Sequence, residues 1–136
     1  MSLDRARQMT PEVAALLSLA MWPDPERIQA ALARYGADPA LQVWVWTLEG
    51  RPISAAGLRL NSDSAEVLHL GTAAEARHTG AGRSLLLGLT TRLQLREVTA
   101  ETDDGAVGFY RRCGFAVRVA FSTGDRIRYH CTLSPA

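Results

Sequence analysis

The chain has 136 residues, of which 47% are hydrophobic, and its formal net charge is +1. A chain of this length buries about two-thirds of its unfolded surface, so we expect one domain over residues 1–136 that folds without disulfides or structural metal ions. The balanced charge gives no reason to expect a nucleic acid or an anionic membrane as partner, and no apolar stretch approaches the roughly twenty residues that span a bilayer.

The two cysteines of the chain are typical of a protein in a reducing compartment. Cys113 and Cys131 do not form a C-x-x-C pair, and the first ten residues are polar and mixed in charge. This pattern indicates neither a secretory signal peptide nor a disulfide framework. We therefore expect a cytoplasmic protein with two free thiols. The histidines and cysteines have no metal-ligand spacing, so no metal site is predicted.

The first predicted elements are a strand over residues 3–8 and a helix. Thr10 is a suitable N-cap, Pro11 suits the first helical position, and Glu12 places an acid in the first turn. The apolar face of this helix consists of Val13, Leu16, Leu17 and Ala20.

A second helix is predicted directly after the first. Asp24 is expected to cap it, with Pro25 at its first position, and Gly36 is expected to end it. Its buried side is expected to contain Ile28, Leu32 and Tyr35.

Three strands are predicted next. Residues 42–48 and 53–60 form a hairpin across a turn at 49–52, and residues 65–72 form a third strand after a turn at 61–64.

The period then changes to that of a helix, with leucines that recur every third or fourth residue from Leu85 to Leu93. Residues 95–102 return to strand, and residues 104–112 predict a short helix that Gly114 ends.

The chain closes with a predicted hairpin of strands 115–121 and 127–133, joined by residues 122–125. Antiparallel strands thus precede strand–helix–strand crossovers. The fold class this order predicts is α/β (α+β), with a mixed, mostly antiparallel central sheet of about six to seven strands and helices on both faces.

The segment RHTGAG, residues 77–82, lies between a predicted strand and a predicted helix. The start of a helix leaves backbone N–H groups unpaired and carries positive partial charge. Gly80 and Gly82 let a phosphate approach that backbone, and Arg77 and Arg83 add formal charge. The segment therefore indicates an anion site, with an ordinary glycine-rich turn as the alternative.

Three phosphate-binding patterns compete for this segment. A P-loop requires lysine after its last glycine, whereas Arg83 and Ser84 follow Gly82 and the chain has no lysine. A Rossmann loop requires a third glycine, where this chain has Leu85. The pattern R/Q-x-x-G-x-G/A is matched at every specified position.

That third pattern resembles the pyrophosphate loop of the GCN5-related N-acetyltransferase (GNAT) superfamily. A second segment, AVGFYRRCGF at residues 106–115, is similar to the superfamily's A-x-x-F-Y-x-x-x-G-F block. With the preceding strand, the resemblance covers residues 65–121, and the order of elements extends it over the whole chain.

The resemblance implies an enzyme that moves an acetyl group from acetyl-CoA to a primary amine by direct transfer in a ternary complex. One alternative is a non-catalytic acyl-CoA-binding or regulatory domain on the same fold. A third reading is a nucleotide-phosphate enzyme that prefers ATP or NAD to coenzyme A.

The resemblance also implies where coenzyme A binds. Backbone near the end of the strand at residues 65–72 would hold the thioester and pantetheine, and amides of residues 78–84 would hold the pyrophosphate. Asp103 stands where the family often has an asparagine that faces pantetheine. The complete expected set is Leu70, Gly71, Thr72, Arg77, His78, Thr79, Gly80, Ala81, Gly82, Arg83, Ser84, Asp103 and Tyr110.

Two side chains are expected to carry the proton transfers. Tyr110 matches the tyrosine that many members use as general acid toward the thiolate, and the alternative is a tyrosine that packs against the cofactor. Glu66 is the expected base, since several histone-type members place a catalytic glutamate eleven residues before the position of Arg77. Strand alternation predicts that Glu66 shares a face with Leu70 and Thr72. The alternative for Glu66 is a solvated carboxylate near a turn.

The remaining reactive side chains are expected to be structural. His69 alternates to the face opposite Glu66, His130 points outward on the last strand, and His78 lines the loop. No base accompanies Cys113, so an acyl-cysteine route is not expected.

The acceptor site in this family forms largely from the first two helices and the strand loops. By resemblance, this region comprises residues 21–25, Trp44 and Trp46, with Tyr35 and Arg59 as further candidates. The two tryptophans could line a pocket, but paired aromatic residues are more often part of the core. The expected partner is a small-molecule or peptide amine, and the chain is expected to act as a monomer or a homodimer.

Overall fold

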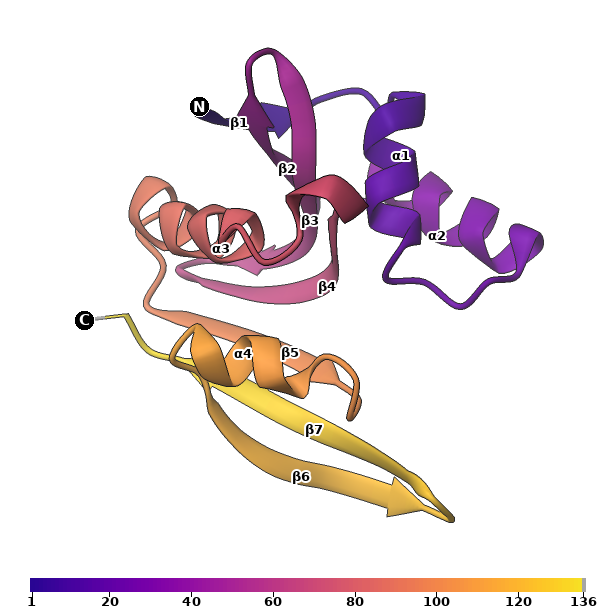
Figure 1. Cartoon of the computed structure of the whole chain (residues 1–136), viewed down its shortest axis with the longest axis vertical. Helices are drawn as coiled ribbons and strands as arrows, with labels where there is room; N and C mark the ends of the chain where they lie inside the picture. Colours follow the sequence, from indigo (N-terminus) through magenta and orange to yellow (C-terminus); the bar gives the residue numbers. More distant parts are fainter. Residues whose placement is uncertain (136) are drawn as a thin grey trace.

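The computed structural model describes residues 1–135 and contains one seven-stranded sheet in the order β1-β2-β3-β4-β5-β7-β6 (Figure 1). Neighbouring strands are antiparallel except for β4 and β5, which are parallel. The strands are β1 (Ser2–Ala6), β2 (Leu41–Leu48), β3 (Arg51–Asn61), β4 (Ser64–Thr72), β5 (Glu97–Thr102), β6 (Ala116–Thr123) and β7 (Arg126–Leu133).

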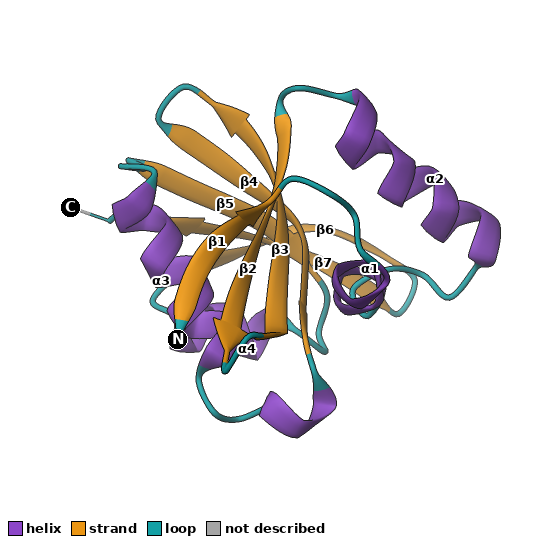
Figure 2. Ribbon diagram, turned by 90° about the horizontal axis from the view of Figure 1, so that it is seen from above, coloured by secondary structure: helices purple, strands orange, loops and turns teal. Residues whose placement is uncertain are grey.

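The helices cover both faces of this sheet, as the view in Figure 2 shows. One face carries two helices from the first third of the chain, and the other carries two from its second half. The helical elements are α1 (Pro11–Ser18), α2 (Pro25–Ala37), the short 3-10 turn η1 (Ala74–Ala76), α3 (Ala81–Arg92) and α4 (Val107–Arg112). The predicted fold class is confirmed. Each helix within residues 1–135 is too short or too polar to cross a bilayer.

The larger core lies between the sheet and the pair α3–α4. Leu58, Leu85 and Leu89 are each at most 1% exposed there, and Trp44 belongs to the same cluster. Trp46 packs partly buried against it, so the two tryptophans serve the core. A smaller core joins α1 to β2 and β3 on the opposite face, around Val13, Leu16, Leu17, Val43, Val45 and Ala55.

Local sequence signals place the starts of α1 and α2 correctly. The Thr10 hydroxyl accepts from the Val13 amide at 3.3 Å, and an Asp24 carboxylate oxygen accepts from the Glu26 amide at 3.0 Å. Both caps satisfy donors that a helix start leaves unpaired.

The end and the burial of α2 differ from the prediction. The helix runs through Gly36 to Ala37 and ends at Asp38, whose carboxylate accepts from the Ala40 amide at 2.9 Å. None of its residues is fully buried, because α2 contacts the sheet mainly along β2. Leu32 and Tyr35 pack partly buried against the smaller core.

Strand β4 contains an irregularity that alternation alone does not predict. Gly57 of β3 pairs with His69, and the next residue, Leu58, pairs with Val67. Leu68 is therefore an extra residue without a partner in β3, which defines a β-bulge.

The bulge reverses which residues face which side of the sheet. Before it, Ala65 and Val67 belong to the core beneath α3 and α4, and after it Leu70 packs on that core. The opposite face, toward α1 and α2, carries Gly71, where an added Cβ would overlap the Leu16 carbonyl oxygen.

Gly71 and Gly36 give a matched test of this packing. We expect Gly71→Ala to lower the free energy of unfolding by at least about 2 kcal/mol, because a methyl group there must push α1 off the sheet. Gly36→Ala should raise it by about 0.5–1 kcal/mol, because nothing lies within 4 Å of the added Cβ in a helix that continues past it. Urea unfolding of both variants measures the difference, and equal effects would contradict the close approach of α1.

Candidate active site

The two parallel strands β4 and β5 separate after the bulge, as Figure 1 shows. Their pairing runs from Ser64 opposite Glu97 to Val67 opposite Ala100 and then stops. A cavity of about 480 Å3 lies where they part. It is lined by the α1–α2 connection (Leu19, Ala20, Met21, Trp22 and Pro23), by β4 and β5 (Val67, Leu68, His69, Leu70, Glu101 and Thr102), and by Asp103, Ala106, Tyr110 and Arg128.

The backbone of β4 beyond the bulge presents hydrogen-bonding groups to this gap. The Ala73 amide donates to the Ile53 carbonyl at 2.8 Å, which fixes the direction of the alternating pairs between β3 and β4. Gly71 therefore directs its backbone toward β3, whereas Leu70 and Thr72 direct theirs away from it. The two expected backbone positions, Leu70 and Thr72, lie on the side that β5 has left.

A second cavity of about 440 Å3 adjoins the first along β4 and α4. It contains the start of α3 and most of the RHTGAG segment. Its lining consists of Thr72, Ala76, Arg77, His78, Gly80, Ala81, Gly82, Arg83, Phe109, Arg112 and Cys113. The two cavities have no lining residue in common but lie on the same two elements, and together they are called the groove.

The second cavity is strongly suited to an anion. Arg77, Arg83 and Arg112 line it, and within residues 1–135 none of the three forms an ion pair. Unlike α1 and α2, α3 begins without a side-chain cap, at Gly80 with φ 86°. Its first amides therefore stay available to a phosphate, which complements both the helix dipole and the arginines.

Two members of the expected loop set are already engaged within the protein. The Ser84 amide donates to the Gly80 carbonyl at 2.8 Å, so it serves the first turn of α3. The Thr79 hydroxyl donates to the Ala76 carbonyl. Neither residue lines the second cavity. Gly71 lines neither cavity, and its lack of a side chain admits α1.

Tyr110 of α4 lines the first cavity, whereas its neighbour Phe109 lines the second. The Tyr110 side chain is only 6% exposed, and its ring packs edge-on against Phe109 and Phe115 with centroid distances of 5.2 Å. Among residues 1–135 no buried side-chain oxygen lacks a partner, and no protein group bonds the Tyr110 hydroxyl, so this hydroxyl opens to the cavity. Burial raises the pKa of Tyr110, and Cys131 and Cys113 raise it further.

Asp103 lines the first cavity, but one of its oxygens is occupied. Oδ1 accepts from the amides of Gly105 and Ala106 at 3.0 and 3.1 Å. The carboxylate therefore shapes the turn that leads into α4, which begins at Val107 rather than at the predicted residue 104.

The predicted face of Glu66 is wrong, because the bulge lies between it and Leu70. Glu66 pairs across the sheet with Arg59, and their side chains form an ion pair at 3.4 Å. Glu66 does not line the cavity. His69, which alternation assigned to the opposite face, shares the α1–α2 face with Glu66 and does line the cavity.

Two residues of α4 that line the second cavity, Phe109 and Arg112, were not predicted as cofactor contacts, and Cys113 beside them was expected to be structural. Their spacing of i, i+3 and i+4 places them on one side of α4, so the AVGFYRRCGF segment contained the signal. Burial raises the pKa of Cys113, against the lowering effect of Arg83 and Arg112.

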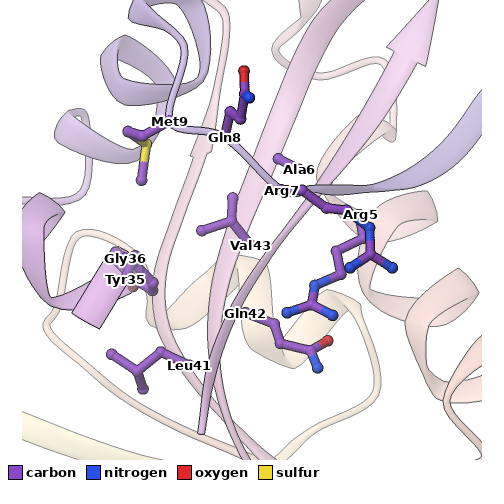
Figure 3. Close-up of a pocket in the computed structure, with 10 residues that line it drawn as sticks. All are labelled: Arg5, Ala6, Arg7, Gln8, Met9, Tyr35, Gly36, Leu41, Gln42 and Val43. Atoms are coloured by element: carbon purple, nitrogen blue, oxygen red, sulfur yellow. The ribbon is translucent and has the colours of Figure 1, made fainter. Parts of the chain in front are cut away.

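The predicted acceptor region is partly in place. Met21, Trp22 and Pro23 line the first cavity, whereas Trp44 and Trp46 do not. Tyr35 lines a third, smaller cavity of about 170 Å3 between α2 and the first two strands (Figure 3). Tyr35 also contacts His69, whose Nδ1 lies 2.6 Å from the Tyr35 hydroxyl.

Comparison with known proteins agrees with this architecture. Residues 8–115 match the family model described as the acetyltransferase (GNAT) family. No curated protein sequence matches the chain.

Solved structures resemble the chain over nearly its whole length. An aminoglycoside 6'-N-acetyltransferase complexed with coenzyme A has a TM-score of 0.75 at 12% identity, with 98% of this chain and 97% of that chain covered. A Bacillus subtilis acetyltransferase in complex with CoA has a TM-score of 0.73 at 14% identity, with 98% of each chain covered. A GNAT family acetyltransferase from Elizabethkingia anophelis with acetyl-CoA bound has a TM-score of 0.71 at 17% identity, with 98% and 97% covered. At these identities the likeness is one of fold.

The anion site of the second cavity can be tested with inorganic pyrophosphate. We expect Arg77→Gln, Arg83→Gln and Arg112→Gln each to weaken its binding about three- to tenfold, since each removes one exposed charge from the groove. Calorimetry at low and high salt measures the effect, which should shrink as salt screens the charges. Arg118→Gln, on β6 outside the cavities, is the matched control. Equal losses in all four variants would contradict a local site.

Proposed function

This chain belongs to the acetyltransferase (GNAT) family, and on that premise we propose that it transfers an acetyl group from acetyl-CoA to a primary amine in a ternary complex. The observation that carries the proposal is the pair of cavities along β4 and α4, one at an arginine-lined helix start and the other where β4 has parted from β5. The bound coenzymes of the similar structures named above support the choice of ligand.

The residues of the groove are chemically matched to coenzyme A. Amides at the start of α3, with Arg77, Arg83 and Arg112, would hold phosphates. The Leu70 and Thr72 backbone would bind the amide groups of the pantetheine arm and the thioester carbonyl. Acetyl-CoA supplies an activated acyl group in the form of a thioester.

The reaction balances with two proton transfers. The amine nitrogen forms a bond to the acyl carbon, the carbon–sulfur bond breaks, and its electron pair leaves on sulfur. The ammonium form of the acceptor releases two protons in all. One goes to solvent by way of a base, and the other replaces the proton that an acid gives to sulfur.

Tyr110 is proposed as that acid. Its hydroxyl opens to the first cavity. Because burial raises the pKa of Tyr110, the phenol stays protonated throughout the neutral range and has a proton to donate.

Direct transfer is favoured over an acyl-cysteine route. Cys113 lines the groove, but burial raises the pKa of its thiol, so the nucleophilic thiolate is disfavoured. Within residues 1–135 no side chain accepts a hydrogen bond from it that could act as its base.

Tyr110→Phe separates an enzyme from a binding domain that only holds acyl-CoA. We expect it to lower turnover about 100-fold with little loss of acetyl-CoA affinity, because the ring still packs and only the proton donor is lost. Thiol release from acetyl-CoA, with a panel of primary amines and with water alone, measures turnover. Calorimetry measures affinity, with ATP as the control ligand.

Two outcomes would contradict the proposal. A wild-type protein that binds ATP in preference to acetyl-CoA would point to the nucleotide reading. A wild-type protein that binds acetyl-CoA but releases no thiol with any acceptor would support the non-catalytic binding domain.

A further inference from the structure

His69 occupies a position that the bulge in β4 creates. It lies one residue before Leu70, and both residues line the first cavity together with Tyr110. Its side chain projects to the face covered by α1 and α2, where the α1–α2 connection lines the same cavity. The imidazole is thus beside both the expected thioester position and the expected acceptor region.

Helix α2 and strand β3 hold the imidazole of His69 in place. Tyr35 from α2 places its hydroxyl 2.6 Å from His69 Nδ1, and the two rings meet edge-on with a centroid distance of 5.8 Å. Gly57 of β3 pairs with His69, and an added Cβ there would overlap the Tyr35 hydroxyl. The absence of a side chain at Gly57 is therefore what lets Tyr35 reach the histidine.

The surroundings keep His69 neutral and Tyr35 protonated. Burial lowers the pKa of His69, and the Arg34 guanidinium lowers it further. Burial raises the pKa of Tyr35, against the lowering effect of Arg34 and Arg59. The ionisable groups that face this pair or share its cavity are Arg34 and Tyr35 from α2, Arg59 from β3, Glu66 from β4, Glu101 from β5, Asp103 after β5, Tyr110 from α4 and Arg128 from β7.

We propose that His69 is the general base of acetyl transfer, and that Tyr35 is the positioning residue that holds its imidazole with Nε2 toward the cavity. His69 is assigned the Nδ1–H tautomer, in which Nδ1–H donates to the Tyr35 oxygen and the lone pair stays on Nε2. That atom takes one proton from the acceptor's ammonium group, and the amine lone pair then attacks the acyl carbon. This assignment rests on the proposed function.

Glu66 is a poorer base for the same step. It lies on the far side of the bulge, outside the cavity, and its carboxylate is paired with Arg59. The Arg59 guanidinium therefore occupies the carboxylate on the face where the acceptor would have to approach it. His69 lines the cavity, and because its pKa is lowered the imidazole is neutral at pH 7 and able to accept a proton.

Measuring which nitrogen of His69 carries the proton tests the proposal, and the measurement does not require the acceptor to be known. Long-range proton–nitrogen correlation spectra of the full chain with coenzyme A bound distinguish Nδ1–H from Nε2–H. The chain has three histidines, so His78→Gln and His130→Gln assign the signals. We expect neutral His69 in the Nδ1–H form, titrating below the usual value of about 6.5. An Nε2–H tautomer, or an imidazolium at neutral pH, would overturn the proposal.

Rate measurements on variants of His69 and Tyr35 provide a second test. We expect His69→Gln to lower kcat/KM for a reactive amine about 100-fold with unchanged acetyl-CoA affinity. Tyr35→Phe should cause a smaller loss, move His69 toward the Nε2–H form and change the acid limb of the pH profile. His130→Gln, outside the cavity, should leave the rate unchanged. If wild type transfers acetyl groups and His69→Gln does so equally well, the base is wrong while the proposed function stands.

Discussion

One unpaired residue in β4 sets the geometry on which the whole groove depends. Leu68 has no partner in β3, so the strand changes phase between Val67 and His69. Up to Val67, β4 pairs with β5, and after Val67 the two strands part. The cavity, the free backbone of Leu70 and Thr72, and the direction of His69 all follow from this change of phase. A regular strand would extend the parallel pairing and close the gap.

The phosphate end of the groove depends on a different constraint, the uncapped start of α3. Helices α1 and α2 begin with side-chain caps from Thr10 and Asp24, whereas α3 has none. Amides without a cap and three arginines that form no ion pair with any of residues 1–135 are unfavourable for the free protein and favourable for an anion. The uncapped helix start and the clustered arginine charges thus lie where a bound anion can compensate for their cost in stability.

Most of the fold was predictable from the sequence because it depends on short segments such as helix caps and hairpin turns. The caps at Thr10 and Asp24, the hairpins and the RHTGAG segment depend on neighbours along the chain, and the structure places them as expected. The faces of Glu66 and His69 were not predictable, because the bulge depends on the register between β3 and β4. Leu68 is an ordinary strand residue in an ordinary strand. Likewise, Gly36 is a frequent helix end, but Asp38 supplies the cap here.

The account depends most directly on which β4 amides are free. Residue-resolved amide hydrogen exchange measures this in the wild-type protein with and without coenzyme A. The account predicts rapid exchange at Leu70 and Thr72 in the free protein, slow exchange at His69 and Gly71, and slowing at Leu70 and Thr72 on binding. Equal protection at all four amides in the free protein, or no change at Leu70 and Thr72 with bound coenzyme A, would contradict it.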